Sequence, residues 1–195
     1  MSEADNDETE VRRAVVLDYL AHGLSEGRRR YRQSPAGYAL GVSDFTLYEV
    51  AFDEDARITI GTHVVVEPAS ERERVADCRP TEYDSLSSGA QSELEYVVRD
   101  IIEADQQRFV DFYNEAQPIT LRLHQLNLLP GIGKKLRNNI LDERKRKPFE
   151  SFEDLEDRVS GLHDPGEVLA NRILEELRDA DLKYRRFVGY DPDNA

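Results

Sequence analysis

The sequence predicts an α+β protein in which a small β-barrel precedes an all-helical domain. Between residue 13 and about residue 80, short apolar runs show the two-residue alternation that is typical of strands. From about residue 90, apolar residues recur every three or four positions, as they do on one face of a helix. The last third of the chain also contains two copies of one helical unit.

The predicted barrel is built from four or five short strands. Apolar, β-favouring runs cover residues 15–20, 38–42, 45–52 and 58–66, and a further short strand passes through Val75. Glycine and proline separate these runs. We expect an acidic disordered tail (1–12), the barrel (13–87), a helical connector (88–118), the two-unit helical domain (119–183) and a C-terminal tail (184–195).

The overall charge argues against a protein held on nucleic acid or on an anionic membrane by net charge alone. The 195 residues include 26 basic and 40 acidic ones, which gives a net charge of -14. The chain has one cysteine, no apolar run long enough for a membrane span and no signal peptide, so we expect a soluble cytoplasmic protein. Only five basic residues are lysines. Such an acidic, arginine-rich composition favours a protein from a halophilic organism, and the alternative is an ordinary acidic protein.

The repeated unit is visible in the spacing of its residues. The first copy covers residues 129–141 and the second covers residues 159–174. Gly131 and Gly161 are 30 positions apart, whereas Ile140 and Ile173 are 33 apart, which indicates a three-residue insertion in the second copy. We expect one helix to start at Ser151, with Asp154 in a capping box, and the last helix to start at Asp164.

The segment with the clearest chemistry is the glycine turn, residues 131–133. Gly131 and Gly133 flank Ile132 and stand directly before a helix, where backbone N–H groups can receive an anion such as phosphate. Lys134 and Lys135 add positive charge beside this site. The pattern looks like a helix-hairpin-helix motif, which binds the sugar-phosphate backbone without reading bases. The alternative is a plain glycine turn between two helices.

Local charge supports the first of these interpretations. The basic segment, residues 121–148, holds eight positive and two negative residues, and its positive residues are Arg122, Lys134, Lys135, Arg137, Arg144, Lys145, Arg146 and Lys147. A basic segment in an acidic protein is typical of nucleic-acid contact. The second copy has His163 and Asp164 where the first has glycine and lysine, so we expect it to be structural.

A second basic cluster is the arginine loop, residues 28–32, which follows the first predicted strand. It contains Arg28, Arg29, Arg30, Tyr31 and Arg32. Arginines around a tyrosine suit backbone contact and base stacking, although a solvated loop would have the same composition. Tyr38, Phe45 and Tyr48 are equally compatible with base stacking and with core packing.

Sequence patterns of enzymes and metalloproteins are missing. The four histidines are dispersed, and the chain has no nucleophile-elbow, P-loop or zinc-protease pattern. We therefore expect neither a metal nor a cofactor, and no catalytic residue is nominated.

Residues 13–188 as a whole resemble the archaeal DUF655 family. The matching segments are residues 16–20, 38–41, 45–47, 108–110, 118–120, 122–124, 128–135 and 144–152. The resemblance implies an S1-like, oligonucleotide-binding (OB) barrel joined to a tandem helix-hairpin-helix domain, with binding to RNA or other nucleic acid and no enzymatic activity. It also implies a link to translation or transcription, with a possible ribosomal or transcription partner.

The function that we expect is RNA binding linked to translation or ribosome biogenesis. Three alternatives stay open: a DNA-binding module in repair or transcription, a base-excision enzyme, and an adaptor that binds other proteins. The enzyme would need an aspartate about 20 residues beyond the hairpin and a base-flipping pocket. Asp154 has nearly that spacing, but its position after Ser151 favours a capping role.

Overall fold

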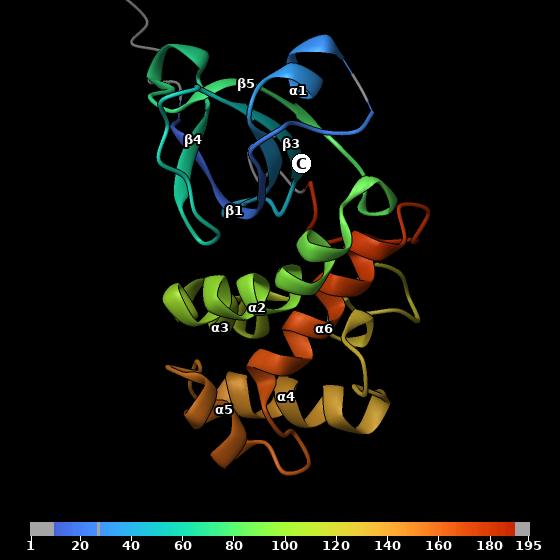
Figure 1. Ribbon diagram of the computed structural model, residues 1–195. Helices are drawn as coiled ribbons and strands as arrows, with labels where there is room; N and C mark the ends of the chain where they lie inside the picture. Colours follow the sequence, from blue (N-terminus) through green and yellow to red (C-terminus); the bar gives the residue numbers. More distant parts are fainter. Residues whose placement is uncertain (1–9, 27, 190–195) are drawn as a thin grey trace, which may run out of the picture. The chain divides into compact units, whose positions relative to one another are not determined.

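The protein consists of two compact units. The computed structural model describes residues 10–26 and 28–189, so the predictions for residues 1–9 and 190–195 lie outside it. The first unit runs from residue 10 to Leu94 and includes Gly189, and the second runs from Glu95 to Val188. Strands lie in the first unit and most helices in the second (Figure 1). The predicted α+β class is confirmed, and the predicted connector, 88–118, is divided between the units.

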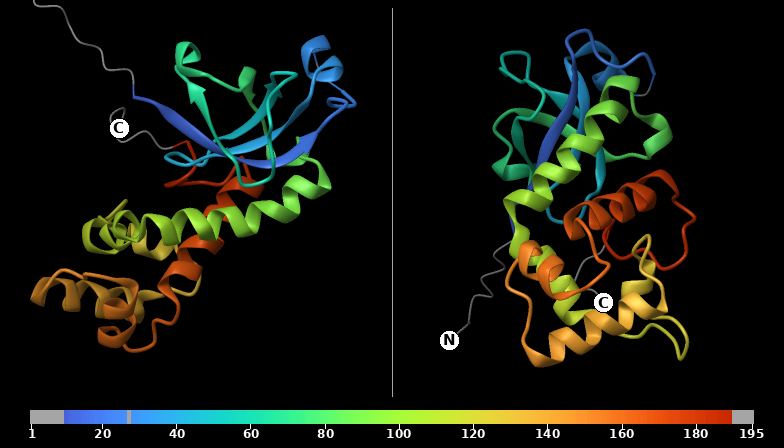
Figure 2. Two further views of the ribbon diagram at one scale, coloured as in Figure 1. Left: turned by 60° about the vertical axis from the view of Figure 1, so that its left-hand side comes forward. Right: turned by 90° about the horizontal axis from the view of Figure 1, so that it is seen from below.

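The first unit is a curled five-stranded antiparallel sheet that forms a half-barrel (Figure 2). The strands follow the order β4-β1-β2-β3-β5, and every pairing is antiparallel. Their bounds are β1 (Arg12–Leu20), β2 (Ala36–Gly41), β3 (Leu47–Phe52), β4 (His63–Glu67) and β5 (Val75–Pro80). The short helix α1 (Arg29–Gln33) follows β1, and the 3-10 helices η1 (Ala69–Glu71) and η2 (Tyr83–Ser85) flank β5.

Alternating residues of the strands form the core on the inner face of the sheet. Ala14 and Val16 point inward from β1, and Val64 and Val66 do the same from β4, as two-residue alternation requires. The remaining buried members of this core are Ala39, Tyr48, Val50, Phe52, Ile58 and Val75. The other face of β2 and β3 is also buried, because all residues of both strands are buried.

Arginine side chains cover part of the outer edge of β4. Arg72 Nε donates to the carbonyl of Val66 at 2.7 Å, and Arg74 Nη2 donates to the carbonyl of His63 at 3.0 Å. Arg72 Nη2 also lies 3.1 Å from the sulfur of Cys78, on β5. These donors occupy carbonyls that an added strand would use, which protects an edge that would otherwise favour aggregation.

Two predicted strands are shorter than expected. The run 45–52 becomes a strand only at Leu47, because Phe45 has a φ of 53° in the turn that follows β2. The run 58–66 becomes a strand only at His63, because Gly61 has a φ of 84° and the Thr62 N–H bonds back to the carbonyl of Thr59. The apolar pattern still predicts which side chains are buried, since the Phe45 side chain is fully buried although it lies outside the strand.

The second unit is helical. The helix α2 (Ser88–Ala104) crosses the boundary between the units, and the others are α3 (Gln106–Glu115), the 3-10 helix η3 (Gln125–Leu128), α4 (Lys134–Arg146), α5 (Phe152–Arg158) and α6 (Pro165–Arg178). The predicted helical stripe is confirmed, because Leu94, Val97, Val98, Ile101, Ile102, Phe109, Phe112, Tyr113 and Ala116 are all buried. None of the described helices is long and apolar enough to cross a membrane.

Both predicted helix starts are confirmed in their caps. Ser151 Oγ accepts from Asp154 N–H at 3.0 Å, and Asp154 Oδ2 accepts in return from Glu150 N–H rather than from Ser151. Asp164 Oδ1 accepts from Glu167 N–H at 3.1 Å, with a proline directly after the cap. The sequence thus places α5 and α6 correctly, because capping residues act locally.

The chain after α6 is attached to that helix by a buried glutamate. The Glu176 carboxylate is fully buried and accepts from the N–H groups of residues 186–188 at 2.8–3.0 Å. Arg172 Nε donates to the same carboxylate at 2.9 Å, and Arg172 Nη2 donates to the carbonyl of Tyr184. Residues 184–188, predicted as part of a tail, are therefore packed on α6.

Candidate nucleic-acid interface

The two copies of the repeat have the same local backbone structure. Gly131 and Gly161 both adopt the left-handed conformation, with φ of 81° and 91°. The next residue in each copy is an apolar one, Ile132 or Leu162, that is at most 4% exposed. Each bonds through its N–H to the carbonyl three residues earlier, at 3.2 and 3.1 Å. The repeat that the spacing predicts is therefore present as two equivalent turns.

The glycine turn, residues 131–133, is fixed to the helix that follows it. Asn127, in η3, donates through Nδ2 to the carbonyl of Ile132 at 3.0 Å. Its Oδ1 accepts from Nη1 of Arg137, in α4, at 3.1 Å. The site residue Arg137 thus has a structural role in addition to its charge.

The helix α4 begins without a side-chain cap. Gly133 is its N-cap residue, and no side chain accepts a hydrogen bond at that position. The N–H groups of the first turn therefore stay available, and they lie at the positive end of the helix dipole. This is the geometry that receives an anion at a helix N-terminus.

Open space surrounds the glycine turn. A Cβ atom placed on Gly131 or Gly133 would meet no other atom within 4 Å. The turn lines an open hollow together with residues 127–130 and with Arg172 and Glu175 of α6. The N–H groups beside the glycine turn therefore border open space.

The two ends of α4 differ in how their cations are paired. Lys134 and Lys135 are exposed and have no ion-pair partner among the residues that the structure describes. At the other end of α4, by contrast, the cations lie near carboxylates, in the pairs Lys145–Asp142 (3.9 Å), Arg146–Glu143 (2.9 Å) and Lys147–Glu150 (2.8 Å). Counting charges along the sequence does not show this difference, although the three-residue spacing within each pair is a signal for it.

Arg144 also has a structural role, although the sequence places it in the basic segment. Its guanidinium donates to the carbonyls of Tyr113 and Ala116, at 3.0 and 2.9 Å, near the end of α3. Burial lowers the Arg144 pKa. Lys134 and Lys135 are therefore the cations beside the glycine turn whose side chains no other described residue holds in place.

The second turn presents a different surface. Asp164 is the N-cap of α6, so its carboxylate stands where a phosphate would have to bind. His163 occupies the position of the second glycine, and its Nδ1 lies 3.6 Å from the Glu156 carboxylate. A carboxylate repels phosphate, so this turn is poorly suited to hold a nucleic-acid backbone.

The arginine loop is exposed, but its tyrosine is not. Arg28, Arg29, Arg30 and Arg32 are exposed, and Arg29 Nε donates to Gln33 Oε1 at 2.7 Å. The side chain of Tyr31 is only 1% exposed, and the Arg79 guanidinium lies 5.0 Å from its ring centre. The prediction that Tyr31 stacks on bases is therefore wrong, because the turn of α1 directs this ring inward.

The three other aromatic candidates are buried as well. Tyr38, Phe45 and Tyr48 are at most 7% exposed, which decides in favour of core packing. Burial, together with the nearby Asp44 carboxylate, raises the pKa of Tyr48 to about 12. None of these three rings is available to stack on a base.

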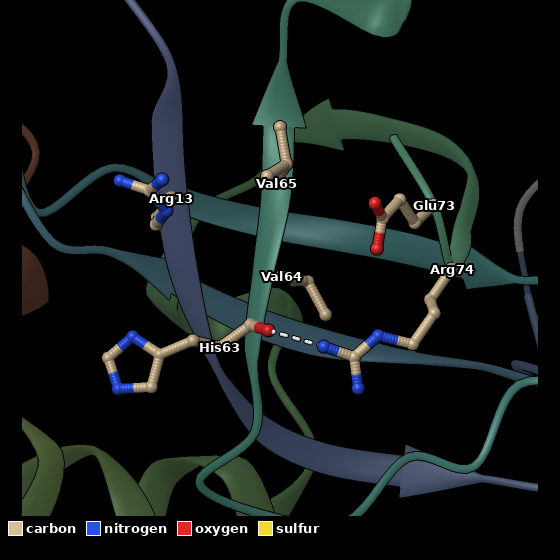
Figure 3. Close-up of a pocket in the computed structure, with 6 residues that line it drawn as sticks. All are labelled: Arg13, His63, Val64, Val65, Glu73 and Arg74. Atoms are coloured by element: carbon tan, nitrogen blue, oxygen red, sulfur yellow. Dashed lines mark hydrogen bonds between the residues drawn. The ribbon is translucent and has the colours of Figure 1, made fainter. Parts of the chain in front are cut away.

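Another pocket, which the sequence analysis did not predict, lies on the first unit beside β4 (Figure 3). Arg13, His63, Val64, Val65, Glu73 and Arg74 line it. Its two arginines are partly neutralised or engaged: Arg74 donates to the carbonyl of His63, and Glu73 contributes a carboxylate. Among the described residues, no group of three or more histidine, cysteine or acidic side chains could hold a metal ion.

Comparison with known proteins identifies the family. Residues 10–189 match the model of DUF655, a family described as proteins of unknown function. The chain belongs to the DUF655 family. An uncharacterised protein of Methanocaldococcus jannaschii is 38% identical over 177 residues, which are 90% of this chain and 78% of that protein. The crystal structure of the DUF655 protein Af1531 from Archaeoglobus fulgidus matches with a TM-score of 0.81 and 37% identity, covering 92% of this chain and all of that one.

Both organisms are archaea, so the predicted membership of a family with archaeal members is confirmed. The high structural similarity extends over both units of this DUF655 chain.

Proposed function

We propose that this DUF655 protein is a non-enzymatic nucleic-acid-binding protein that holds a phosphate backbone at the glycine turn. One observation supports this most strongly: an uncapped helix N-terminus faces open space beside two unpaired lysines. The backbone N–H groups donate to phosphate oxygens, and Lys134 and Lys135 add attraction that is independent of base sequence.

The arrangement fits a tandem helix-hairpin-helix domain. In this proposal η3 and α4 form the first hairpin, with Ile132 buried beneath the turn, and α5 and α6 form the second. The first hairpin binds the backbone, and the second stabilises the domain through its capped turn. Such contacts position the protein on nucleic acid without specifying bases.

RNA is the ligand that we favour, with a role in translation or ribosome biogenesis. The strand order of the half-barrel and the pairing of β1 with both β2 and β4 suit an OB or S1-like barrel, a fold that binds single strands. The exposed arginines of the loop after β1 would follow the backbone of the bound RNA strand.

Replacing Arg28, Arg29 and Arg30 by serine should then weaken binding of single-stranded RNA more than binding of duplex RNA.

The contacts of Asp154 support a structural rather than a catalytic role. Its carboxylate accepts from Glu150 N–H and from Arg158 Nη1, at 3.1 and 2.9 Å. Burial raises its pKa, but these two donors outweigh burial and lower the pKa below its usual value. Such a side chain supports the N-terminus of α5 and already has its hydrogen-bond partners.

The test compares two matched pairs of lysines at the two ends of α4. Replacing Lys134 and Lys135 by serine removes the unpaired charge, and replacing Lys145 and Lys147 removes the same charge from paired positions. Binding of single-stranded RNA, duplex RNA and duplex DNA is measured for both variants and the parent. The first variant should bind about tenfold more weakly, whereas the second should bind nearly as the parent does.

The outcomes separate the candidate functions. Equal losses in both variants would show that only diffuse charge matters, and would contradict a site at the glycine turn. No binding of any nucleic acid by the parent would reject the proposed function. Tighter binding of duplex DNA than of either RNA would transfer the proposal to DNA.

A further inference from the structure

Leu121 is fully exposed at the tip of a loop in the second unit. Its exposure of 107% compares with 65% for Tyr96 and 51% for Ile60, two other exposed apolar side chains. Single exposed leucines are common, so exposure alone indicates nothing. The structure of the surrounding loop makes this leucine unusual.

The loop that presents Leu121 is closed by hydrogen bonds on both sides of the tip. Pro118 and His124 form an antiparallel bridge at its base. The N–H groups of residues 119 and 120 both donate to the Leu123 carbonyl, at 2.8 and 3.0 Å. Thr120 Oγ1 accepts from the N–H groups of residues 122 and 123, at 3.3 and 3.0 Å. These bonds hold the tip in one conformation, so presenting Leu121 requires little ordering when a ligand binds.

The same loop leads directly into the candidate interface. His124, at its base, accepts through Nδ1 from Leu126 N–H at 3.1 Å and so caps η3, which continues to the glycine turn. The loop and the N-terminal end of α4 lie on the same side of the second unit (Figure 1). Arg122, next to the tip, is exposed, and no side-chain partner for its guanidinium occurs within the described part of the chain.

We propose that Leu121 is an apolar wedge that packs against a base of the nucleic acid whose backbone is held at the glycine turn. This inference rests on the proposed function and extends it from phosphate contact to base contact. Leucine is one of the apolar side chains that proteins insert at base steps, where they disturb the stacking. Arg122 would pair with the phosphate beside the contacted base.

The chemistry around Leu121 favours nucleic acid over a protein partner. A stable protein interface buries roughly 800 Å² on each side and has an apolar centre of several residues. Here one leucine stands next to an unpaired arginine, at the start of the basic segment of an otherwise acidic protein. A single apolar contact flanked by positive charge fits a base and its phosphate.

The experiment uses the full-length protein and an RNA duplex that contains a single-nucleotide bulge. A fluorescent base analogue, whose emission rises when it is unstacked, is placed beside the bulge. The variants are Leu121→Ser, which removes the apolar contact, and Leu121→Met, which keeps it. Ile60→Ser, in the first unit, is the control for an exposed apolar residue elsewhere.

The parent and Leu121→Met should raise the emission on binding, and Ile60→Ser should behave in the same way. Leu121→Ser should bind about tenfold more weakly and lose the rise in emission. Its salt dependence should stay that of the parent, because no charge is removed.

Two results would overturn the wedge. The first is an unchanged affinity and emission in Leu121→Ser while the Lys134 and Lys135 variant still loses binding; in that case the backbone site stands and Leu121 has no contact with bases. The second is a parent that binds no nucleic acid, which rejects the proposed function and the wedge with it.

Discussion

Asn127 and Arg137 are joined next to the glycine turn by a hydrogen bond of 3.1 Å from Arg137 Nη1 to Asn127 Oδ1. The amide of the same asparagine donates to the carbonyl of Ile132 at 3.0 Å. One side chain therefore connects η3, the turn and α4. We infer that this connection holds the N–H groups of the turn in place before a phosphate arrives, which lowers the entropic cost of binding.

Replacing Asn127 by alanine should loosen the turn without changing any charge. We expect amide hydrogen exchange of residues 131–134 to accelerate and the affinity for RNA to fall about threefold to tenfold. Loss of two hydrogen bonds should also lower the free energy of unfolding by about 1–3 kcal/mol. The control is Asn138→Ala, because the Asn138 side chain also accepts from Arg137 but, unlike Asn127, is not hydrogen-bonded to Ile132. Unchanged exchange in Asn127→Ala would show that the turn does not need this connection.

The affinity for nucleic acid should depend only weakly on salt concentration, although the chain contains a basic segment. Most cations at the C-terminal end of α4 are already paired, so few counterions are released there. We expect a slope of log affinity against log salt equivalent to about two to four phosphate contacts. Serine at Lys134 and Lys135 should reduce that slope by about one or two contacts, whereas serine at Lys145 and Lys147 should leave it unchanged. A slope near eight contacts for the parent would mean that the whole segment acts as diffuse charge.

His124 should make the second unit less stable in mild acid. Burial, followed by the charges of Arg144 and Arg137, lowers its pKa below the ordinary 6.5. As the pH falls below 6.5, the unfolded chain takes up a proton that the folded chain resists, so stability is present above that pH and is lost below it. Protonation also removes the acceptor for Leu126 N–H.

The variant His124→Asn keeps a capping acceptor but does not titrate. Urea unfolding at several pH values should therefore show a smaller loss of stability between neutral and mildly acidic pH in this variant than in the parent. Parallel losses in the two proteins would assign the acid sensitivity to other groups.

The helical half was largely predictable from sequence because its signals are local. The caps at Ser151 and Asp164 and the repeated turn at Gly131 and Gly161 each depend on residues within one or two turns of helix. The strands of the half-barrel were also recognised, but two of them, β3 and β4, begin later than their apolar runs. Phe45 and Gly61 adopt positive φ within apolar runs, and an alternation of apolar residues does not reveal such turns.

The candidate site was predictable in its position but not in its electrostatics. The sequence indicated the glycine turn and the basic segment, but it did not distinguish Lys134 and Lys135 from the paired cations near the end of α4. Tyr31 was assigned to the ligand although its ring is buried, because the sequence did not show that α1 directs it inward. The rigid loop under Leu121 depends on the bridge between Pro118 and His124, a tertiary contact without a sequence pattern.

The most direct test of phosphate binding at the glycine turn is the RNA affinity of Gly133→Val. Gly133 has extended backbone angles, and a Cβ there meets no atom within 4 Å, so the variant should fold as the parent does. Gly131 is less suitable, because its φ of 81° would strain any other residue. The valine side chain would stand between the N–H groups and a phosphate. We predict a loss on the order of 1–3 kcal/mol, of equal size for RNAs of different sequence. An affinity equal to that of the parent, with the fold intact by circular dichroism, would contradict phosphate binding at this turn.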